Sequence, residues 1–420
     1  MSIQFYDREE ELKVIEDEIK SPKASLIIIF GRRRIGKTTL VLKALENFKH
    51  NYIYVENQNV NNFLDKCTKS FNQEFRSLDD FFEFIFKTSL KEKIILVIDE
   101  YQRLAKKISA KIQYYWDIFL NKSKLKLILL GSTIGMIERD ISYTGPLYGR
   151  ATKIIKLNGF DYRTVRLMFK GFDEREIIKI FSIFGGTPYY LTLVNKAKNL
   201  EKNIFELFIK KGAILYEEIE RLLSYELREL GRYLSILEAL SKGKLTLKEI
   251  SDFTKLERFQ TKKYMYVLEK LGIIRKELSI AKSKIPRYSF VDNFFEFYMR
   301  FIYENKEFIE RDQREFVLKK ITEGIKEYYG KIFEKIALQT VSKTLKGYKV
   351  GKYWDNEGNE IDIVAMKDSF AIFFECKFGK YNEADVKVFE KRAEEVARKL
   401  KIKKFKTKIL TPENLLKLKE

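Results

Sequence analysis

The sequence has few of the residues that build metal sites and covalent frameworks. Its 420 residues include one histidine, His50, and two cysteines, Cys67 and Cys376. One histidine excludes polyhistidine metal sites and all but a single Ser-His-Asp triad. Two cysteines exclude a disulfide scaffold and a four-cysteine zinc site. With only 5 prolines, the chain is neither proline-rich nor collagen-like.

The sequence also lacks an apolar run of the roughly 20 residues that cross a bilayer. Its start reaches the charged run Asp7-Arg8-Glu9-Glu10 almost at once, which is unlike a signal peptide. We therefore expect a soluble, cytoplasmic protein that does not contact a membrane. Single domains usually have about 100–200 residues, so a chain of this length should form two to four of them.

Positive charge is in excess. Lys and Arg total 81 against 60 Asp and Glu, a formal net charge of +21. This makes a polyanionic partner such as nucleic acid plausible. The same excess is also compatible with the Lys/Glu-rich surfaces of hyperthermophile proteins and with the amino-acid bias of an AT-rich genome.

Short apolar runs alternate with helical patterns in the first part of the chain. The runs cover residues 25–30, 52–55, 94–98 and 125–130. Buried parallel strands have this continuous apolar character, whereas half-exposed strands alternate. The pattern predicts an α/β fold, with a parallel sheet covered by helices on both faces.

The first of these runs ends in a glycine-rich motif, GRRRIGKT, which fits G-x-x-x-x-G-K-[ST] and opens a helix. In that context the backbone N–H groups of the loop cradle phosphate oxygens. We expect Lys37 to reach the β- and γ-phosphates and Thr38 to bind Mg²⁺. The alternative is a plain glycine turn before a basic helix. The predicted phosphate-binding residues are Gly31, Arg32, Arg33, Arg34, Ile35, Gly36, Lys37, Thr38 and Thr39.

Polar residues follow two later apolar runs. Asp99 and Glu100 end the run ILVIDE, where open α/β sheets bind ligands. Asp99 is predicted to hold Mg²⁺ through water, and Glu100 to orient or deprotonate the attacking water. Ser132, after LILLG, has a hydroxyl able to sense the γ-phosphate, or it belongs to an ordinary turn. Arg150 is a candidate catalytic residue that either approaches phosphate or pairs with an acid elsewhere.

Farther along, residues 230–290 show three short helices and a hairpin, the order of a winged helix-turn-helix. The third helix should cover about 257–271 and carries Arg258, Gln260, Lys262 and Lys263 near its start, where DNA groove contacts form. The hairpin carries Lys282, Lys284 and Arg287, which suit contacts to the phosphates of double-stranded DNA.

Near the C-terminus, two apolar strands carry acids. A turn at 367–369 should fold residues 360–365 and 373–377 into an antiparallel pair, which places Asp362 nearly opposite Glu375. Glu375 and Lys377 share one face because they are two residues apart. Two carboxylates beside a lysine are able to bind a hard cation and a water for phosphodiester attack. A charged sheet edge without activity is the alternative.

Several motifs together resemble the archaeal ATPase family, in the STAND branch of AAA-type P-loop NTPases. They are FYDREEEL, GRRRIGKTTL, ILVIDEYQRL, LLGSTIGMI, PLYGR and GGTPYYL. The resemblance implies ATP rather than GTP, and a helical lid whose Gly-x-Pro element brings Pro188 near the base. It also implies a winged helix after the lid, which in this branch often packs against the lid as a regulatory module.

The C-terminal strands resemble the PD-(D/E)xK nuclease core. Asp362 and the Glu375-x-Lys377 pair match the motif, and Glu334 matches the acid that often lies on the preceding helix. The segments GKYWDNEGNEIDIVA and FFECKFG resemble DUF234, a domain that accompanies many archaeal ATPases. This resemblance implies a restriction-endonuclease-like domain, either active or kept for binding.

Together these observations predict four segments: an ATPase core at 1–160, a helical lid at 161–228, a winged helix with its connecting helix at 229–310, and a nuclease-like domain at 311–420. The expected function is an ATP-hydrolysing, Mg²⁺-dependent switch whose C-terminal region associates with DNA, with a protein partner or a second copy as a further possibility. The alternatives are an ATP-regulated, metal-dependent DNA nuclease and a DNA-binding regulator that uses ATP as a structural ligand.

Overall fold

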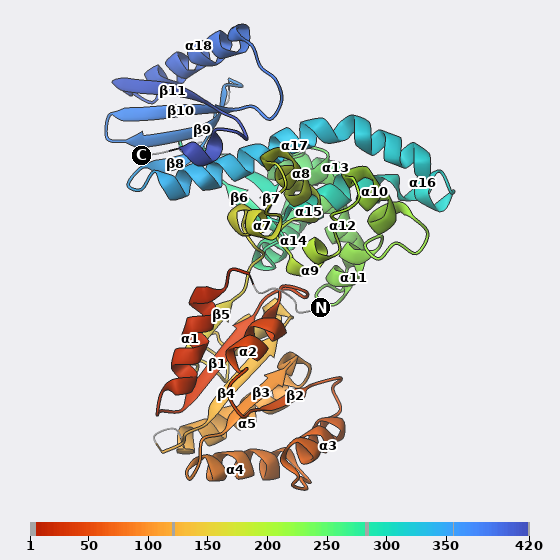
Figure 1. The fold of residues 1–420 in the computed structure, drawn as a ribbon, viewed down its shortest axis with the longest axis vertical. Coiled ribbons are helices and arrows are strands. Elements are labelled where there is room, and N and C mark those ends of the chain that lie inside the picture. The colour runs from red at the N-terminus through yellow and green to blue at the C-terminus, as the bar shows by residue number, and fades with distance from the viewer. Residues whose placement is uncertain (1–5, 120–121, 282–284, 356, 419–420) are drawn as a thin grey trace. The chain divides into compact units, whose positions relative to one another are not determined.

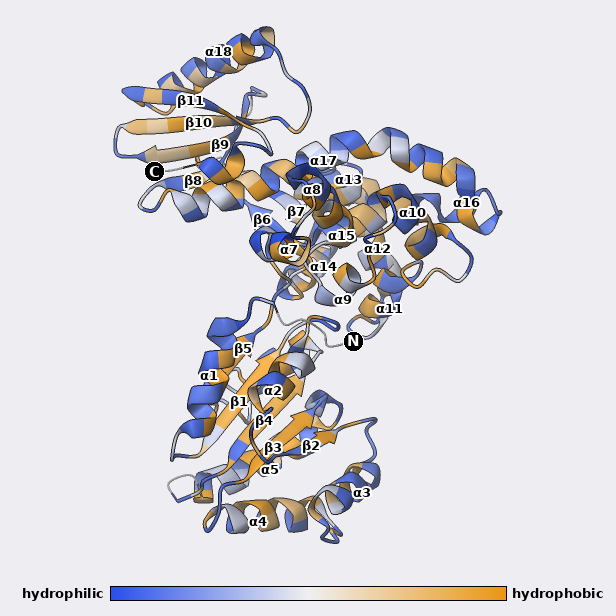
Figure 2. Cartoon of the chain, in the orientation of Figure 1, coloured by the Kyte–Doolittle hydropathy of each residue, from blue (hydrophilic) through white to orange (hydrophobic). Residues whose placement is uncertain are grey.

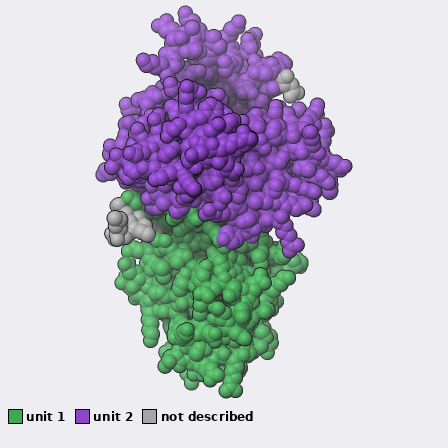
Figure 3. Space-filling view, turned by 90° about the vertical axis from the view of Figure 1, so that its right-hand side faces the viewer, with its two compact units in different colours: residues 1–159, 187–189 green, residues 160–186, 190–420 purple. Residues whose placement is uncertain are grey.

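The computed structural model of the protein describes residues 6–119, 122–281, 285–355 and 357–418. The chain forms two compact units (Figure 3). Unit 1 contains residues 1–159 and 187–189, and unit 2 contains residues 160–186 and 190–420. Across the described residues, no helix is long and apolar enough to cross a membrane.

A five-stranded parallel sheet forms the centre of unit 1 (Figure 1). The strand order is β2-β3-β4-β1-β5, and every neighbouring pair is parallel. The sequence predicted four of these strands and missed β5, which is short, lies at the sheet edge and has lysines at both ends. The strands are β1 (Ser25–Phe30), β2 (Asn51–Tyr54), β3 (Ile95–Asp99), β4 (Lys126–Gly131) and β5 (Lys153–Lys156).

Helices pack on this sheet because its central strands are apolar on both faces. Strands β1, β3 and β4 are buried along their whole length and appear orange in Figure 2. Parallel strands bring their carboxyl ends to one edge, so the loops that follow them meet there. The helices are α1 (Glu9–Lys20), α2 (Lys37–Ala44), α3 (Val60–Phe71), α4 (Leu78–Ser89), α5 (Ala105–Phe119) and α6 (Ile134–Asp140).

Unit 2 begins with helices and continues into three helices and a hairpin. The first helices are α7 (Tyr162–Met168), α8 (Glu174–Phe184), α9 (Pro188–Thr192), which starts in unit 1, α10 (Leu200–Ile204) and α11 (Glu218–Ser224). The three-helix-and-hairpin segment has the order that the sequence predicts, and β6 and β7 pair antiparallel. It comprises α12 (Leu230–Ser241), α13 (Leu247–Thr254), α14 (Arg258–Lys270), β6 (Ile274–Glu277) and β7 (Arg287–Phe290).

The last part of unit 2 is a four-stranded sheet with helices. After α15 (Asn293–Phe297) and α16 (Lys306–Glu310), the long helix α17 (Arg314–Thr344) leads into the strands. The sheet order is β11-β10-β9-β8; β9 pairs antiparallel with β8 and β10, and β11 pairs parallel with β10. Its elements are β8 (Lys349–Trp354), β9 (Glu360–Lys367), β10 (Phe370–Cys376), α18 (Glu383–Lys399) and β11 (Lys404–Leu410).

The sequence expectations for this region were incomplete. The sequence analysis predicts two acid-bearing strands in this region and misses strand β8, and it gives no bounds for the long helix α17 that precedes them. Strand β8 escaped detection because its residues are only partly buried until Tyr353 and Trp354. The predicted turn at 367–369 is correct, and Asp368 adopts a left-handed conformation there with φ +54°.

Candidate nucleotide site and C-terminal carboxylates

The glycine-rich loop joins β1 to α2 with a geometry that requires both of its glycines. A Cβ atom on Gly31 would lie 2.4 Å from the carbonyl oxygen of Leu157, so a side chain does not fit. Gly36 precedes α2 with φ +92°, a left-handed conformation that other residues rarely adopt. The loop therefore turns its backbone amides into the start of a helix, the arrangement that binds phosphate.

Lys37 is held in place by the loop itself. Its side chain is buried, and Nζ donates hydrogen bonds to the carbonyl oxygens of Gly31 at 2.8 Å and Arg32 at 3.0 Å. Burying an ammonium group is costly unless it is hydrogen-bonded. The carbonyl oxygens of the loop therefore hold one positive charge at the place where the sequence predicts phosphate contact.

The two predicted Mg²⁺ ligands are brought together. Thr38 Oγ1 donates to Asp99 Oδ2 at 2.8 Å, and Asp99 lies buried at the end of β3. Tyr52, on β2, donates to the same carboxylate oxygen at 2.5 Å. Burial and the nearby carboxylate raise the pKa of Tyr52, so its hydroxyl stays a donor. A hydroxyl and a carboxylate side by side are suitable ligands for Mg²⁺, which prefers oxygen.

Glu100 and Ser132 also meet, joined by a buried glutamine. Ser132 Oγ donates to Glu100 Oε2 at 2.8 Å, and Gln102 Nε2 donates to the same oxygen at 2.6 Å. Gln102 Nε2 also lies 3.2 Å from Ser132 Oγ. Glu100 adopts a left-handed conformation with φ +57°, which for a residue other than glycine costs free energy and often marks a functional site. One carboxylate oxygen is therefore fixed by two neutral donors.

The other predicted loop residues have separate surroundings. The Arg34 guanidinium lies 4.3 Å from the ring centroid of Tyr189, and the position of a Cβ on Gly36 is 4.0 Å from Pro188 Cγ. Pro188 and Tyr189 thus pack against the loop within unit 1. Ile35 belongs to the core of unit 1, Arg32 and Arg33 are half-buried, and Thr39 is exposed.

Arg150 is engaged away from this cluster. Its Nε and Nη2 atoms contact the Asp117 carboxylate on α5 at 2.8 Å and 2.5 Å, and Nη1 donates to the carbonyl oxygens of Pro146 and Tyr148. Of the two possibilities left open by the sequence, the structure shows the ion pair with an acid.

The predicted C-terminal residues gather at the carboxyl end of β10. Asp362 Oδ2 accepts a hydrogen bond from the Cys376 backbone at 2.7 Å, and Lys377 Nζ lies 3.0 Å from Glu375 Oε1. The other oxygen of Glu375 is buried and accepts no hydrogen bond from a described residue; its nearest ion-pair partner, Arg392, is 3.8 Å away. Glu334 on α17 faces the same group and lies 3.5 Å from Lys352 Nζ.

The three carboxylates repel one another. Burial, together with the charges of Glu334 and Glu375, raises the pKa of Asp362 to about 7. Burial also raises the pKa of Glu334, against the opposing effect of Lys352. Within the described residues, no three His, Cys, Asp or Glu side chains are arranged to hold a metal ion as they stand. The cluster has the charge to attract a cation, and its carboxylates would have to move to enclose one.

Comparisons with known proteins show which family the chain belongs to. Residues 5–194 match a family model described as an ATPase domain predominantly from Archaea, and residues 298–389 match a model of archaeal and bacterial proteins of unknown function, DUF234. A relative from Methanocaldococcus jannaschii, uncharacterized protein MJECL04, is 35% identical over 405 residues, which cover 91% of this chain and 89% of the relative. The chain belongs to this archaeal ATPase family.

Other relatives cover less of this archaeal ATPase. The uncharacterized ATP-binding protein MJ1659 of the same organism is 26% identical over 275 residues, 50% of this chain and 75% of the relative. Among solved structures, the Walker-type ATPase PABY2304 of Pyrococcus abyssi is similar with a TM-score of 0.49 at 20% identity, covering 70% of this chain and 96% of that one.

In this archaeal ATPase, the hairpin of the three-helix-and-hairpin segment docks on the C-terminal sheet. The Ile280 amide donates to the Lys352 carbonyl oxygen on β8 at 2.8 Å, and Ser279 Oγ donates to the Trp354 carbonyl oxygen at 2.9 Å. Arg287, predicted to contact DNA phosphate, instead pairs with Glu360 at 2.6 Å and lies over the Trp354 ring. Lys282 and Lys284 lie outside the described residues.

Helix α14 is the third helix of that segment. Unlike the hairpin, which docks on the C-terminal sheet, α14 presents its basic residues to solvent. Arg258, Lys262 and Lys263 are exposed, and Gln260 is half-exposed. Phe259 and Tyr266 on the same helix are 79% and 58% exposed. Basic side chains interleaved with exposed aromatic rings form a surface suited to nucleic acid.

Several residues at these sites escaped the sequence reasoning. Gln102 and Tyr52 hold the two acids of the nucleotide site, and Asp117 holds Arg150. Gln102 stands within the quoted motif ILVIDEYQRL, three residues after Asp99, and that proximity was the available signal. Nothing in the local pattern marks Tyr52 or Asp117, because each meets its partner only through the fold.

Proposed function

We propose that the protein binds ATP with Mg²⁺ and hydrolyses it, acting as a switch. The observation that carries this proposal is the Thr38–Asp99 contact of 2.8 Å beside a glycine loop that holds Lys37. Gly31 to Thr39 bind the triphosphate, with Lys37 on the β- and γ-phosphates. Thr38 and Asp99 hold Mg²⁺, which when bound neutralises charge on the phosphates. Pro188 lies near the base.

In the same proposal Glu100 orients the attacking water and accepts its proton. Gln102 and Ser132 both donate to Oε2 of Glu100, so Oε1 is the oxygen that contacts the attacking water. Ser132 also senses the γ-phosphate. Arg150 contacts phosphate only after its ion pair with Asp117 breaks, and breaking that pair costs free energy.

Two substitutions test the proposal. Lys37→Ala should abolish ATP–Mg²⁺ binding measured by calorimetry, whereas Lys43→Ala, at an exposed lysine on α2 paired with Glu46, should leave it intact. Glu100→Gln should bind ATP and hydrolyse it on the order of a hundredfold or more slowly, because the general base is lost. Normal turnover by Glu100→Gln would remove Glu100 from this role. Tight ATP binding without turnover in the unmodified protein would favour a DNA-binding regulator with ATP as a structural ligand.

A second candidate function is metal-dependent cleavage of double-stranded DNA at the C-terminal carboxylates. It is favoured by the buried Glu375 oxygen that accepts no hydrogen bond from the described residues, and by the raised pKa of Asp362. Asp362 and Glu375 would hold a divalent cation with Glu334 nearby, and Lys377 would stabilise the developing charge. DNA would be held through the exposed winged-helix face of α14.

Strand cleavage and ATP hydrolysis, scored in one tube, separate the candidates. A nuclease loses cleavage with Asp362→Asn or Lys377→Ala and keeps ATP hydrolysis, since these residues belong to unit 2 and the phosphate loop belongs to unit 1. Absence of Mg²⁺- or Mn²⁺-dependent cleavage by the unmodified protein, under conditions where it hydrolyses ATP, would rule out the nuclease and leave the switch.

A further inference from the structure

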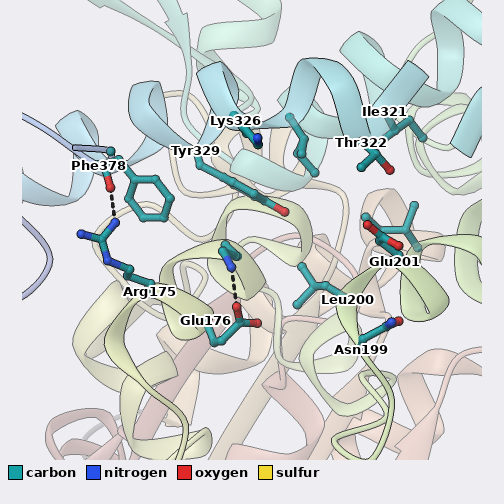
Figure 4. Close-up of a pocket in the computed structure, with 14 residues that line it drawn as sticks. Arg175, Glu176, Asn199, Leu200, Glu201, Ile321, Thr322, Lys326, Tyr329 and Phe378 are labelled. Carbon is teal, nitrogen blue, oxygen red and sulfur yellow. Dashed lines mark hydrogen bonds and ion pairs between the residues drawn. The ribbon is translucent and has the colours of Figure 1, made fainter. Parts of the chain in front are cut away.

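Unit 2 contains a cavity of about 620 Å³ that none of the sites above uses. Helices α8, α10 and α17 enclose it together with Phe378 and Gly379, which follow β10 (Figure 4). Its volume lies within the range of cavities that bind small molecules, about 300–1,000 Å³. Its lining includes none of the residues assigned to the phosphate loop or to the carboxylate cluster.

The cavity has an apolar floor with two aromatic rings. Ile204, Ile321 and Ile325 are buried there. The Tyr329 and Phe378 ring centroids are 5.8 Å apart. Figure 4 shows the Tyr329 ring reaching across the cavity with its hydroxyl towards Glu201. A flat, unsaturated ring fits such a floor, since it buries apolar area and stacks on aromatic faces.

Most charges around the cavity are already paired. Lys179 pairs with Glu176, and Arg175 pairs with Glu413 at 2.7 Å and donates to the Phe378 carbonyl oxygen. Lys326 and Glu201 are different, because neither side chain forms a hydrogen bond or ion pair with another residue that the structure describes. The cavity therefore offers one ammonium and one carboxylate to a ligand.

We propose that this cavity binds a single nucleotide unit. The base would lie on Tyr329 and Phe378 and donate an N–H group to Glu201, and the phosphate would pair with Lys326. An acyl chain would bury Glu201 without a donor, and an inorganic anion would leave the apolar floor uncovered. A free mononucleotide and the terminal nucleotide of a DNA strand share this chemistry. Because Phe378 directly follows Lys377, the bound unit would lie beside the carboxylate cluster.

The test uses the full chain carrying Lys37→Ala, so that the phosphate loop does not contribute. Thymidine monophosphate and a short single strand with a 5′-phosphate and a fluorescent label are titrated separately. At least one probe should bind saturably, and adding Lys326→Ala should weaken that binding about tenfold. Lys387→Ala, at an exposed lysine on α18, is the matched control and should change nothing.

Tyr329→Leu keeps the buried apolar volume and removes the ring, and it should weaken binding comparably while thermal unfolding shows the chain to be folded. Binding of the mononucleotide identifies a free nucleotide as the ligand, and binding of the strand alone identifies a strand end. The proposal is overturned if neither probe binds, or if binding is the same with Lys326→Ala and Tyr329→Leu as with Lys387→Ala. ATP hydrolysis by the unmodified chain is measured alongside, so that failure of the two proposals is distinguishable.

Discussion

Gln102 is the residue that most directly links the acids and hydroxyls of the nucleotide site. Its amide donates to Glu100 and reaches Ser132 from a position that is 4% exposed. Gln102→Met keeps the size of the side chain and removes the donor. We expect ATP affinity to hold and kcat to fall about tenfold or more, the effect of losing one hydrogen bond to a charged group. Steady-state kinetics measure this; an unchanged kcat would show that Ser132 and Arg103 position Glu100 without Gln102.

Asp362 makes the stability of the protein depend on pH. Its pKa is raised from the ordinary 3.8 to about 7, so the folded state holds a proton that the unfolded chain releases. Stability should therefore be greatest below about pH 4 for this group and decline as the pH rises towards 7. Asp362→Asn removes this pH dependence. Between pH 5 and pH 8 the unmodified protein should lose on the order of 2 kcal/mol more free energy of unfolding than the variant does.

Denaturant unfolding at the two pH values measures the difference. Asp252→Asn, at an exposed aspartate on α13, is the control and should leave the pH dependence as it is. An Asp362→Asn protein with the same pH dependence as the unmodified one would mean that burial and the neighbouring carboxylates do not raise the pKa of Asp362 in solution.

The conformation of the glycine-rich loop was predictable from the sequence, whereas the partners of the arginines were not. In the loop, a glycine pattern after an apolar run specifies a local turn before a helix, and the roles assigned to its residues stay predictions. Arg150 and Arg287 find Asp117 and Glu360 only when distant segments come together. A guanidinium group is equally suited to phosphate and to a carboxylate, so the sequence left both partners open for Arg150 and predicted a phosphate contact for Arg287.

At the scale of elements, α14 and the hairpin have different surroundings although one motif predicted both. The hairpin binds the β8 edge through the Ile280 amide, and Ile280 joins the apolar core of the C-terminal sheet. An edge strand exposes unpaired backbone groups, and covering it with a docked segment is one way proteins protect it. The sequence predicted the order of these elements, but not this contact, because β8 itself was missed.

We therefore expect DNA binding to depend on α14 and not on Arg287. Lys263→Ala should weaken duplex binding and reduce the slope of log K against log salt by about 1, the effect of losing one phosphate contact. Arg287→Ala should leave affinity and slope unchanged and lower the melting temperature, because it loses Glu360 and Trp354. Fluorescence anisotropy across a salt series measures both, with Lys276→Ala on β6 as the control. If Arg287→Ala and Lys263→Ala weaken duplex binding equally, the hairpin also contacts DNA.

At the scale of the whole molecule, the chain has two compact units with separate apolar cores. One core surrounds the parallel sheet of unit 1, and another surrounds the C-terminal sheet of unit 2. The sequence predicted the first sheet from apolar runs that alternate with helical patterns, and the second from two acid-bearing apolar strands together with a resemblance to a nuclease core. The four predicted segments stay a prediction. By contacts, most of residues 160–420 form one unit, in which α17 packs against α8 and α10 and also against the C-terminal strands β8, β9 and β10.

This division predicts how nucleotide acts on stability. A ligand that binds only folded unit 1 should raise the melting temperature of that unit alone, by a free energy of about 2.7 kcal/mol when its concentration is 100 times its Kd. Scanning calorimetry with and without ATP–Mg²⁺ should show one transition that moves and one that does not, and neither should move in Lys37→Ala. Equal movement of all transitions would mean that the units unfold cooperatively, and ATP would then stabilise the C-terminal sheet as strongly as the site that binds it.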